Sequence, residues 1–339
     1  MNGSDRVITI DNPPPLAGGG RFDRLEIGFR TWGRLDAGAT NAVLVCPALT
    51  GDRHVDRWWP GLLGPGRSLD HKTDFIICAD VLGGSGGTSG PGSRRGLRPW
   101  GERFPAVSVR DMVTVQRLLV DALGTRRLKL VIGGSLGGMQ VLEWAVSHPD
   151  RVASAVAIAA PARQTAWAAA LNHAQRRALA THGDLELARM IAMLSYRHWD
   201  NLDGRFGPDN GGERTAQGWL EHHGRALRER FDPVAYRRLM DAMDGHDLGR
   251  GRWGWRKALR AVRARTLIVG IASDLLYPPR DQQALADAIP GADLEWLEAE
   301  QGHDAFLIEQ ERLDSIVSGF RQEAPHPHVS RQSFLEARA

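Results

Sequence analysis

The sequence predicts an α/β fold, in which a mostly parallel β-sheet is covered by helices and interrupted by a helical insert. Short apolar or alternating runs bounded by turn residues indicate strands, and amphipathic helical stretches separate several of them. This alternation is typical of a parallel sheet with helices on both faces. Between about residues 162 and 259 the strand pattern stops, and it resumes afterwards.

The predicted elements follow directly from these patterns. Strands are expected at residues 24–31, 42–46, 75–79, 128–132, 152–159, 266–271 and 294–297. Helices are expected between strands at 109–123 and 139–147, and within the insert at 166–180, 184–197, 215–231 and 233–243. Asp232 and Pro233 suit the N-cap and the first turn of the last of these helices.

The insert divides the α/β domain into two parts of the chain. We expect this domain over residues 1–161 and 260–339, and a helical lid subdomain over residues 162–259. Open α/β sheets bind ligands at the carboxyl ends of their strands. The lid is therefore expected to cover that edge of the sheet.

Composition excludes several classes of protein. Hydrophobic residues make up 42% and charged residues 24% of the 339 residues, which excludes a disordered or fibrous chain. No apolar run is long enough for a membrane helix, and residues 1–20 lack a secretory pattern, so we expect a cytoplasmic protein without membrane contact. Cys46 and Cys78 lie in apolar runs and are expected to be buried free thiols.

The basic charge is spread along the chain. The net charge is only +3, and no basic tail or stripe occurs, which argues against nucleic acid as a partner. The densest basic stretch, residues 250–265, also contains Trp253 and Trp255. It could be a solvated or lid-contacting face, or it could hold a phosphorylated ligand or RNA.

Ser135 is the candidate nucleophile. It lies in the G-x-S-x-G motif of residues 133–137, between a predicted strand and a predicted helix. A sharp turn there lifts the serine hydroxyl above the sheet, and the helix N-terminus favours developing negative charge. Residues 83–87 also spell G-x-S-x-G, but the sequence that follows them cannot start a helix, so we expect a loop there.

Other nucleotide and metal motifs give no support for a cofactor. Gly249, Gly251 and Gly254 match G-x-G-x-x-G, but no strand precedes them. The sequence has no phosphate-binding G-x-x-x-x-G-K-[ST] motif and no histidine with zinc-ligand spacing. We therefore expect neither a metal nor a bound cofactor.

A serine nucleophile needs a base and an orienting carboxylate, and both follow in the order acid, then histidine. Asp274 follows the predicted strand 266–271, and His303 follows the last predicted strand. We expect Ser135, His303 and Asp274 to form a catalytic triad. The backbone N–H groups of Leu49 and Leu136 are the candidate oxyanion hole.

Several segments together resemble the homoserine O-acetyltransferase family, which has an α/β-hydrolase fold. The similarity extends from about residue 22 to residue 313 and is most specific at 41–52, 64–70, 104–112, 133–140, 142–145, 188–190 and 302–307. The resemblance implies transfer of an acetyl group from acetyl-CoA to the side-chain hydroxyl of L-homoserine, in methionine biosynthesis. It implies a ping-pong route through an acyl-serine.

The resemblance also implies roles for further residues. Arg189 and Tyr196 match the family residues that hold the carboxylate end of the amino acid, and Asp304 matches the residue that holds its ammonium. Arg189 and Tyr196 are two helical turns apart, so they share one face. The family resemblance further implies a homodimer built through the helical inserts.

This chain departs from the family pattern at two positions that bear on the choice of acyl donor. Pro47 stands where the family usually has histidine, and Ser85 stands in the 83–91 loop where the family usually has cysteine. Three alternatives remain open from sequence: a succinyl donor or serine acceptor on the same scaffold, a carboxylic-ester hydrolase, and a non-catalytic binding member.

Overall fold

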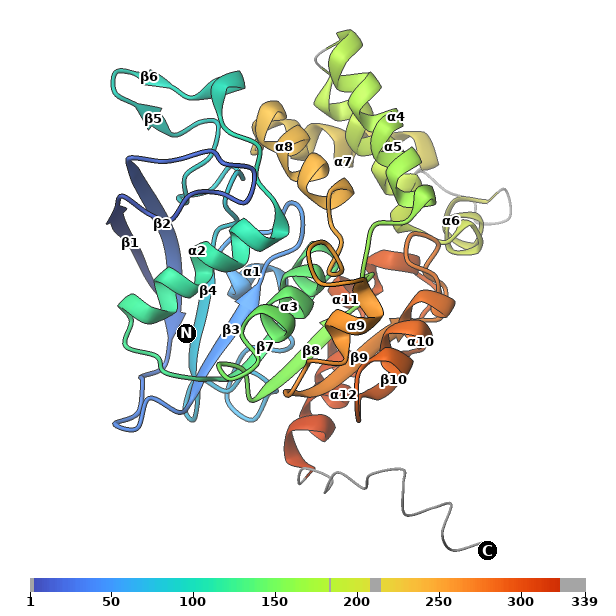
Figure 1. Cartoon of the computed structure of the whole chain (residues 1–339). Helices are drawn as coiled ribbons and strands as arrows, with labels where there is room; N and C mark the ends of the chain where they lie inside the picture. Colours follow the sequence, from blue (N-terminus) through green and yellow to red (C-terminus); the bar gives the residue numbers. More distant parts are fainter. Residues whose placement is uncertain (1–2, 183, 208–214, 324–339) are drawn as a thin grey trace, which may run out of the picture.

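An eight-stranded sheet forms the centre of the molecule (Figure 1). The computed structural model describes residues 3–182, 184–207 and 215–323. The strand order is β1-β2-β4-β3-β7-β8-β9-β10. These strands are β1 (Ser4–Asp11), β2 (Arg24–Trp32), β3 (Ala42–Cys46), β4 (Phe75–Ala79), β7 (Leu128–Gly134), β8 (Ser154–Ile158), β9 (Arg265–Ile271) and β10 (Asp293–Leu297).

The sheet is mostly parallel, as predicted. All neighbouring pairs from β4 to β10 in this order are parallel, whereas β2 runs antiparallel to both β1 and β4. A separate two-stranded hairpin consists of β5 (Arg94–Arg95) and β6 (Arg98–Pro99).

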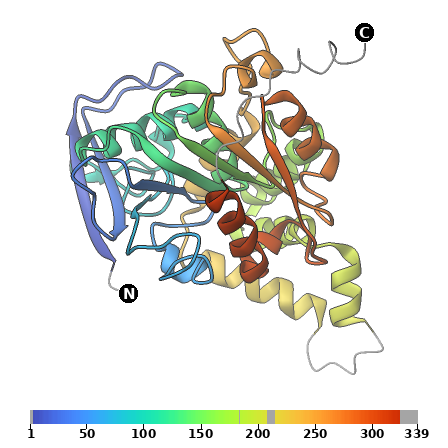
Figure 2. The ribbon, with the colours of Figure 1, turned by 90° about the horizontal axis from the view of Figure 1, so that it is seen from below.

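Helices cover both faces of the sheet (Figure 2). Outside the insert they are α1 (Val55–Trp58), α2 (Val109–Ala122), α3 (Leu136–Ser147), α10 (Pro279–Ala288), α11 (Ala305–Ile308) and α12 (Gln310–Gln322), with short 3₁₀ turns η1 (Gly101–Arg103) and η3 (Gly302–Asp304). Alternate residues of β3 point to opposite faces. Leu44 and Cys46 join the core beneath α2, α3 and α10, whereas Val43 and Val45 join the core beneath α1, α11 and α12.

The described residues of the insert region form helices joined by turns. It contains α4 (Ala166–His182), α5 (Leu185–Tyr196), α6 (Trp199–Phe206), α7 (Ala216–Arg228), α8 (Pro233–Asp244) and α9 (Trp255–Leu259). Figure 1 shows α4, α5, α6, α7 and α8 grouped beyond one end of the sheet. The Asp232 side chain accepts from the backbone N–H of Ala235, and Pro233 is the first residue of α8, as predicted.

The structure differs from the predicted elements in a few places. No element was predicted at β1, α1, the β5–β6 hairpin, α6, α9 or α10. Asp184 and Thr215, predicted as helical, are instead the N-caps of α5 and α7. Their side chains accept hydrogen bonds from the backbone N–H groups of Leu187 and Gly218. The predicted strand 152–159 is shorter, because β8 begins at Ser154.

The two cysteines are buried free thiols, as predicted. Within the basic stretch 250–265, three arginines pair with acids of the α/β part. Arg252 pairs with Glu143, Arg263 with Asp150, and Arg265 with Asp293 and Glu323.

Candidate active site

Ser135 occupies a strained turn between β7 and α3. Its φ of 57° and ψ of −122° are unusual for a residue with a side chain, and such strain is concentrated at functional sites. Its backbone N–H donates to Ile158 O at 2.9 Å, which ties the turn to β8. Close packing explains the neighbouring glycines: a Cβ on Gly137 would overlap the carbonyl oxygen of Cys46. The turn therefore combines a strained backbone at Ser135 with a glycine at position 137, where no side chain would fit.

Ser135, His303 and Asp274 form one continuous hydrogen-bonded chain. His303 Nε2 lies 2.9 Å from Ser135 Oγ, and His303 Nδ1 lies 2.7 Å from Asp274 Oδ2. The other carboxylate oxygen of Asp274 accepts from the backbone N–H groups of Leu276 and Tyr277, at 2.7 and 3.0 Å. Asp274 is thereby fixed with Oδ2 facing the imidazole. The structure thus brings together the three residues that the sequence placed in order.

The surroundings of His303 favour its charged form. Burial opposes the imidazolium, but the charge and hydrogen bond of Asp274, together with the charge of Asp304, outweigh burial and raise the pKa of His303. Three rings enclose the imidazole: Tyr277, Tyr196 and Phe306, with centroids at 5.4, 5.6 and 5.7 Å. A base in this setting accepts a proton readily and keeps its orientation.

Leu49 and Leu136, the candidate oxyanion residues, lie on two neighbouring segments. Leu136 is the first residue of α3, where backbone N–H groups are free of helical partners. Leu49 lies in the turn after β3, which is closed by a hydrogen bond from Gly51 N to Ala48 O at 3.0 Å. Both residues are buried.

The side chains expected to hold an amino acid lie beside His303. Asp304 follows His303 in the chain, and the Arg189 guanidinium lies over the Tyr196 ring, 5.3 Å from its centroid. Burial raises the pKa of Asp304 despite the opposing charges of Arg189 and Arg197. Burial, together with Arg189, Arg197 and neighbouring groups, lowers the pKa of His223 to about 4. The positive charges of Arg189 and Arg197 therefore favour an anion in this part of the insert.

Sequence reasoning missed several residues of the site. Arg197 Nε lies 3.4 Å from Asp304 Oδ2 and was not predicted, although it adjoins Tyr196. The rings of Tyr196 and Tyr277 flank His303, and the buried Tyr236 hydroxyl donates to Gln175 Oε1 on the insert. Burial raises the pKa of both Tyr236 and Tyr277. Tyr277 lies three residues after Asp274, so its nearness to the predicted acid was the available signal, whereas Tyr236 lies on α8, where no motif marks it.

Backbone contacts join the insert to the loops around the site. A Cβ on Gly302 would lie 2.6 Å from His198 N, so the turn that carries His303 packs directly on the insert. The Arg230 guanidinium donates to Thr50 O at 2.8 Å, and Ser85 Oγ accepts from Asp232 N at 2.8 Å. Leu49, Ser85 and Arg230 line a cavity of about 130 Å³. Ser85, one of the two departures from the family, therefore lies at this cavity.

Within residues 3–182, 184–207 and 215–323, no group of three or more His, Cys, Asp or Glu side chains could hold a metal ion. No helix in those ranges is long and apolar enough to cross a membrane.

Known proteins resemble this chain along nearly its whole length. Residues 41–187 match the family described as alpha/beta hydrolase fold. The homoserine O-acetyltransferase of Trichormus variabilis is 44% identical over 91% of this chain and 92% of its own length. That of Chlorobaculum tepidum is 41% identical over 95% of this chain and 96% of its own length.

Solved structures agree on the fold. The crystal structure of homoserine O-acetyltransferase from Staphylococcus aureus is similar with a TM-score of 0.86 and 27% identity, covering 99% of this chain and all of the other. The crystal structure of esterase E22 has a TM-score of 0.86 at 20% identity over 95% of this chain and 99% of its own, which supports the fold alone. With a shared α/β-hydrolase fold and relatives above 40% identity over most of their length, the chain belongs to the homoserine O-acetyltransferase family.

Proposed function

We propose that this protein is a homoserine O-acetyltransferase that moves an acetyl group from acetyl-CoA to the side-chain hydroxyl of L-homoserine, a step of methionine biosynthesis. The observation that carries the proposal is the Ser135–His303–Asp274 hydrogen-bonded chain beneath an insert that brings Arg189 near Asp304. The first feature suits acyl transfer, and the second suits an amino acid.

In the first half-reaction, Ser135 Oγ attacks the thioester carbonyl of acetyl-CoA. His303 Nε2 takes the hydroxyl proton as the new C–O bond forms, and Asp274 stabilises the resulting imidazolium. The N–H groups of Leu49 and Leu136 donate to the oxyanion. The C–S bond then breaks, and the leaving thiolate of CoA receives the proton from His303.

In the second half-reaction, L-homoserine replaces CoA. Arg189 and Tyr196 bind its carboxylate, and Asp304 binds its ammonium. His303 takes the proton of the homoserine hydroxyl as that oxygen attacks the acetyl-serine carbonyl. The bond to Ser135 Oγ breaks, the proton returns to this oxygen, and O-acetylhomoserine leaves.

Transfer requires that water be kept from the acetyl-serine. We propose that residues 162–259 serve as a lid over an α/β domain of residues 1–161 and 260–339. The packing of Gly302 against His198 supports this, since it joins the insert to the turn bearing His303. We further propose a cytoplasmic homodimer that associates through the lid helices.

The test measures CoA thiol release from acetyl-CoA with and without L-homoserine. Parallel reactions use succinyl-CoA and L-serine, and intact-protein mass follows acetylation. We expect homoserine-dependent release and a transient acetyl adduct that the Ser135→Ala variant lacks. Turnover by Ser135→Ala above roughly one-thousandth of the wild-type kcat would refute the nucleophile.

The same experiment separates the rival activities. Release that is equal without an acceptor would mean that water resolves the acetyl-serine, so that the protein is an esterase or thioesterase. Preference for succinyl-CoA or L-serine would reassign the donor or the acceptor. Absence of any adduct, confirmed with a serine-directed phosphonate, would indicate a binding protein.

A further inference from the structure

Gln140 connects the two segments that carry the oxyanion amides. It is fully buried on α3, one turn after Leu136. Its side-chain Nε2 donates to Pro47 O and to Leu136 O, each at 3.1 Å. Pro47 precedes Leu49 in the turn after β3, so one amide group spans both halves of the proposed oxyanion hole.

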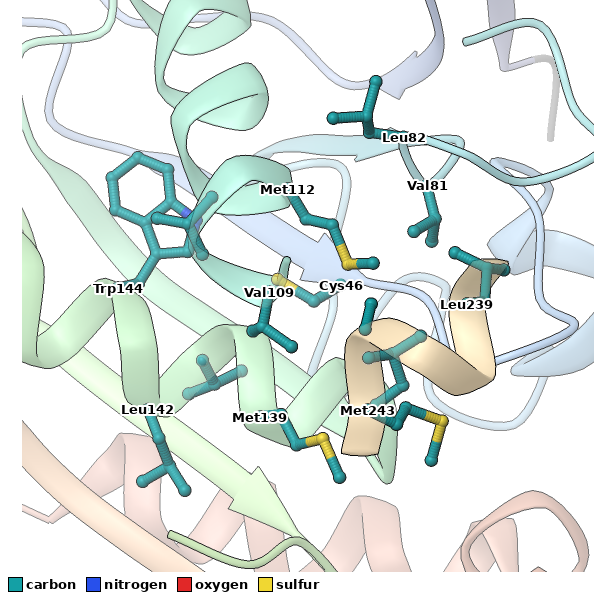
Figure 3. Close-up of a cluster of buried hydrophobic side chains, with 14 of the residues drawn as sticks. Cys46, Val81, Leu82, Val109, Met112, Met139, Leu142, Trp144, Leu239 and Met243 are labelled. Carbon is teal, nitrogen blue, oxygen red and sulfur yellow. The ribbon is translucent and has the colours of Figure 1, made fainter. Parts of the chain in front are cut away.

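A chain of buried donors fixes the orientation of the Gln140 amide. The indole N–H of Trp144 can only donate, and it donates to Gln116 Oε1 at 2.7 Å. Gln116 must therefore present its NH₂ group to Gln140, and its Nε2 donates to Gln140 Oε1 at 2.6 Å. The NH₂ group of Gln140 is left to face the two carbonyls. Figure 3 shows Trp144 and Cys46, the last residue of β3, in one cluster of buried hydrophobic side chains.

The Leu49 turn is held from both ends. Gln140 binds the carbonyl of Pro47 before it, and Arg230 binds the carbonyl of Thr50 after it. The turn itself closes through Gly51 N and Ala48 O, which leaves the Leu49 N–H out of the closing bond. On the other side, the same Gln140 amide holds the first carbonyl of α3. The Gln140 side chain thus links directly the two segments that carry these N–H groups.

We propose that Gln140 is a positioning residue of the oxyanion hole, which sets the distance between the Leu49 and Leu136 N–H groups. The inference rests on the proposed function, because it needs Ser135 as the nucleophile. Gln140 touches no reacting atom. It acts on the tetrahedral intermediates of both half-reactions and leaves homoserine binding to Arg189, Tyr196 and Asp304.

The test replaces Gln140 by methionine, which has a similar length and no donor. Acetylation of Ser135 by p-nitrophenyl acetate is followed as the nitrophenol burst, so that no acceptor is needed. We expect Gln140→Met to lower the acetylation rate by about ten-fold or more, since loss of an oxyanion donor itself costs about 100-fold to 1,000-fold. In the full reaction, the KM for L-homoserine should stay within about two-fold of the wild type.

Inactivation by a serine-directed phosphonate provides a second readout. Its adduct places an oxygen where the oxyanion forms, so the inactivation rate should fall by about the same factor as acetylation. Gln282→Met is the matched control, since Gln282 is also a fully buried glutamine, on α10. It should change the melting temperature and leave acetylation within about two-fold.

Gln116→Met keeps the inference testable if Gln140→Met does not fold. It removes the hydrogen bond from Gln116 Nε2 to Gln140 Oε1 and leaves Gln140 in place. We therefore expect the acetylation rate to fall by about three-fold or more. The inference would be overturned if these variants were acetylated at the wild-type rate, or if the KM for homoserine rose without a slower burst. It would also be overturned if Gln282→Met lost as much acetylation rate as Gln140→Met. A wild-type enzyme that is acetylated but transfers nothing to homoserine would refute the proposed function instead, and the burst would still decide the role of Gln140.

Discussion

In the proposed mechanism, the protonation state of His303 decides when Ser135 can attack. The base must be neutral, so the acetylation rate falls as the pH drops through the pKa of His303. Because Asp274 raises this pKa, we expect the acid limb of the profile above the usual histidine value of about 6.5. The measurement is the pH dependence of the p-nitrophenyl acetate burst.

The Asp274→Asn variant tests the cause of this shift. It removes the charge that raises the pKa of His303, so burial dominates and the acid limb moves to lower pH. The maximal rate should fall by about 10,000-fold, because the imidazole is held in the wrong tautomer. A limb that moved to higher pH would contradict the assigned role of Asp274.

Asp304 offers a test of acceptor binding that leaves the nucleophile intact. In Asp304→Asn, the ammonium of homoserine loses its charged partner, and we expect the KM for homoserine to rise by about ten-fold or more. At a pH above the His303 limb, acetylation by p-nitrophenyl acetate should stay within about two-fold. Asp304→Glu, which keeps the charge, serves as the control. An equal fall in acetylation would mean that Asp304 acts on His303 and not on the substrate.

The sequence could predict those residues of the site that follow strands within recognisable motifs. Ser135, Asp274 and His303 each lie just beyond a predicted strand, and parallel strands bring their carboxyl ends to one edge. Gln140 and Tyr277 lie only five and three residues after Ser135 and Asp274, but the side chains of both bond to groups far away in the chain, at Pro47 and Gln164. Tyr236 comes from the insert. No local pattern encodes these long-range contacts.

At the scale of elements, burial determines which strands the sequence reveals. The strands β3 and β4 are buried at every residue, read as unbroken apolar runs, and were predicted with the observed bounds. The edge strand β1 is largely exposed and mixes Ser, Asp, Arg and Thr with its apolar residues, so its strand character depends on pairing with β2. The short helix α6 buries no residue completely and gave a similarly weak signal.

The turn η3 joins the insert to the catalytic edge of the sheet, and Gly302 makes this contact possible. Its φ is +78°, and a Cβ would lie 2.6 Å from His198 N. We expect Gly302→Ala to cost about 1–3 kcal/mol of unfolding free energy. It should also push the insert away from His303 and admit water, so that acetate forms at the expense of O-acetylhomoserine.

The control for this variant is Gly319→Ala in α12. No atom lies within 4 Å of the position that a Cβ would take there, and alanine favours a helix. Thermal unfolding and the ratio of acetate to O-acetylhomoserine are measured for both variants. If Gly302→Ala is destabilised but its ratio of acetate to O-acetylhomoserine is unchanged, the contact at η3 does not serve to exclude water.

At the scale of the whole molecule, the sheet order explains why residues far apart in the chain meet. Leu49 follows β3, Ser135 follows β7, and Asp274 and His303 follow β9 and β10. Since β3, β7, β8, β9 and β10 are parallel neighbours, their carboxyl ends share one edge. The insert leaves the sheet after β8 and returns at β9, so it begins and ends beside this edge.

The exposed apolar residues of the insert bear on the proposed homodimer. Leu187 and Leu194 are 38% and 54% exposed and lie two helical turns apart on α5, so they share one face. Trp167 on α4 and Trp199 on α6 are also more than half exposed. Large exposed apolar side chains on helices of one region are typical of an interface, and a second copy of the chain can cover them by symmetry.

We therefore expect the wild-type protein to be a dimer in solution and the double variant Leu187→Glu, Leu194→Glu to be a monomer, because the interface would bury two unpaired carboxylates in each subunit. Light scattering after size-exclusion chromatography measures the mass directly. Leu97→Glu is the matched control, since Leu97 is 94% exposed at the β5–β6 turn, outside the insert. A monomeric wild type, or a double variant that remained dimeric, would show that the exposed face of α5 is not the interface. If the double variant is monomeric and still acetylated at Ser135, the groups needed for acetylation are complete within one subunit.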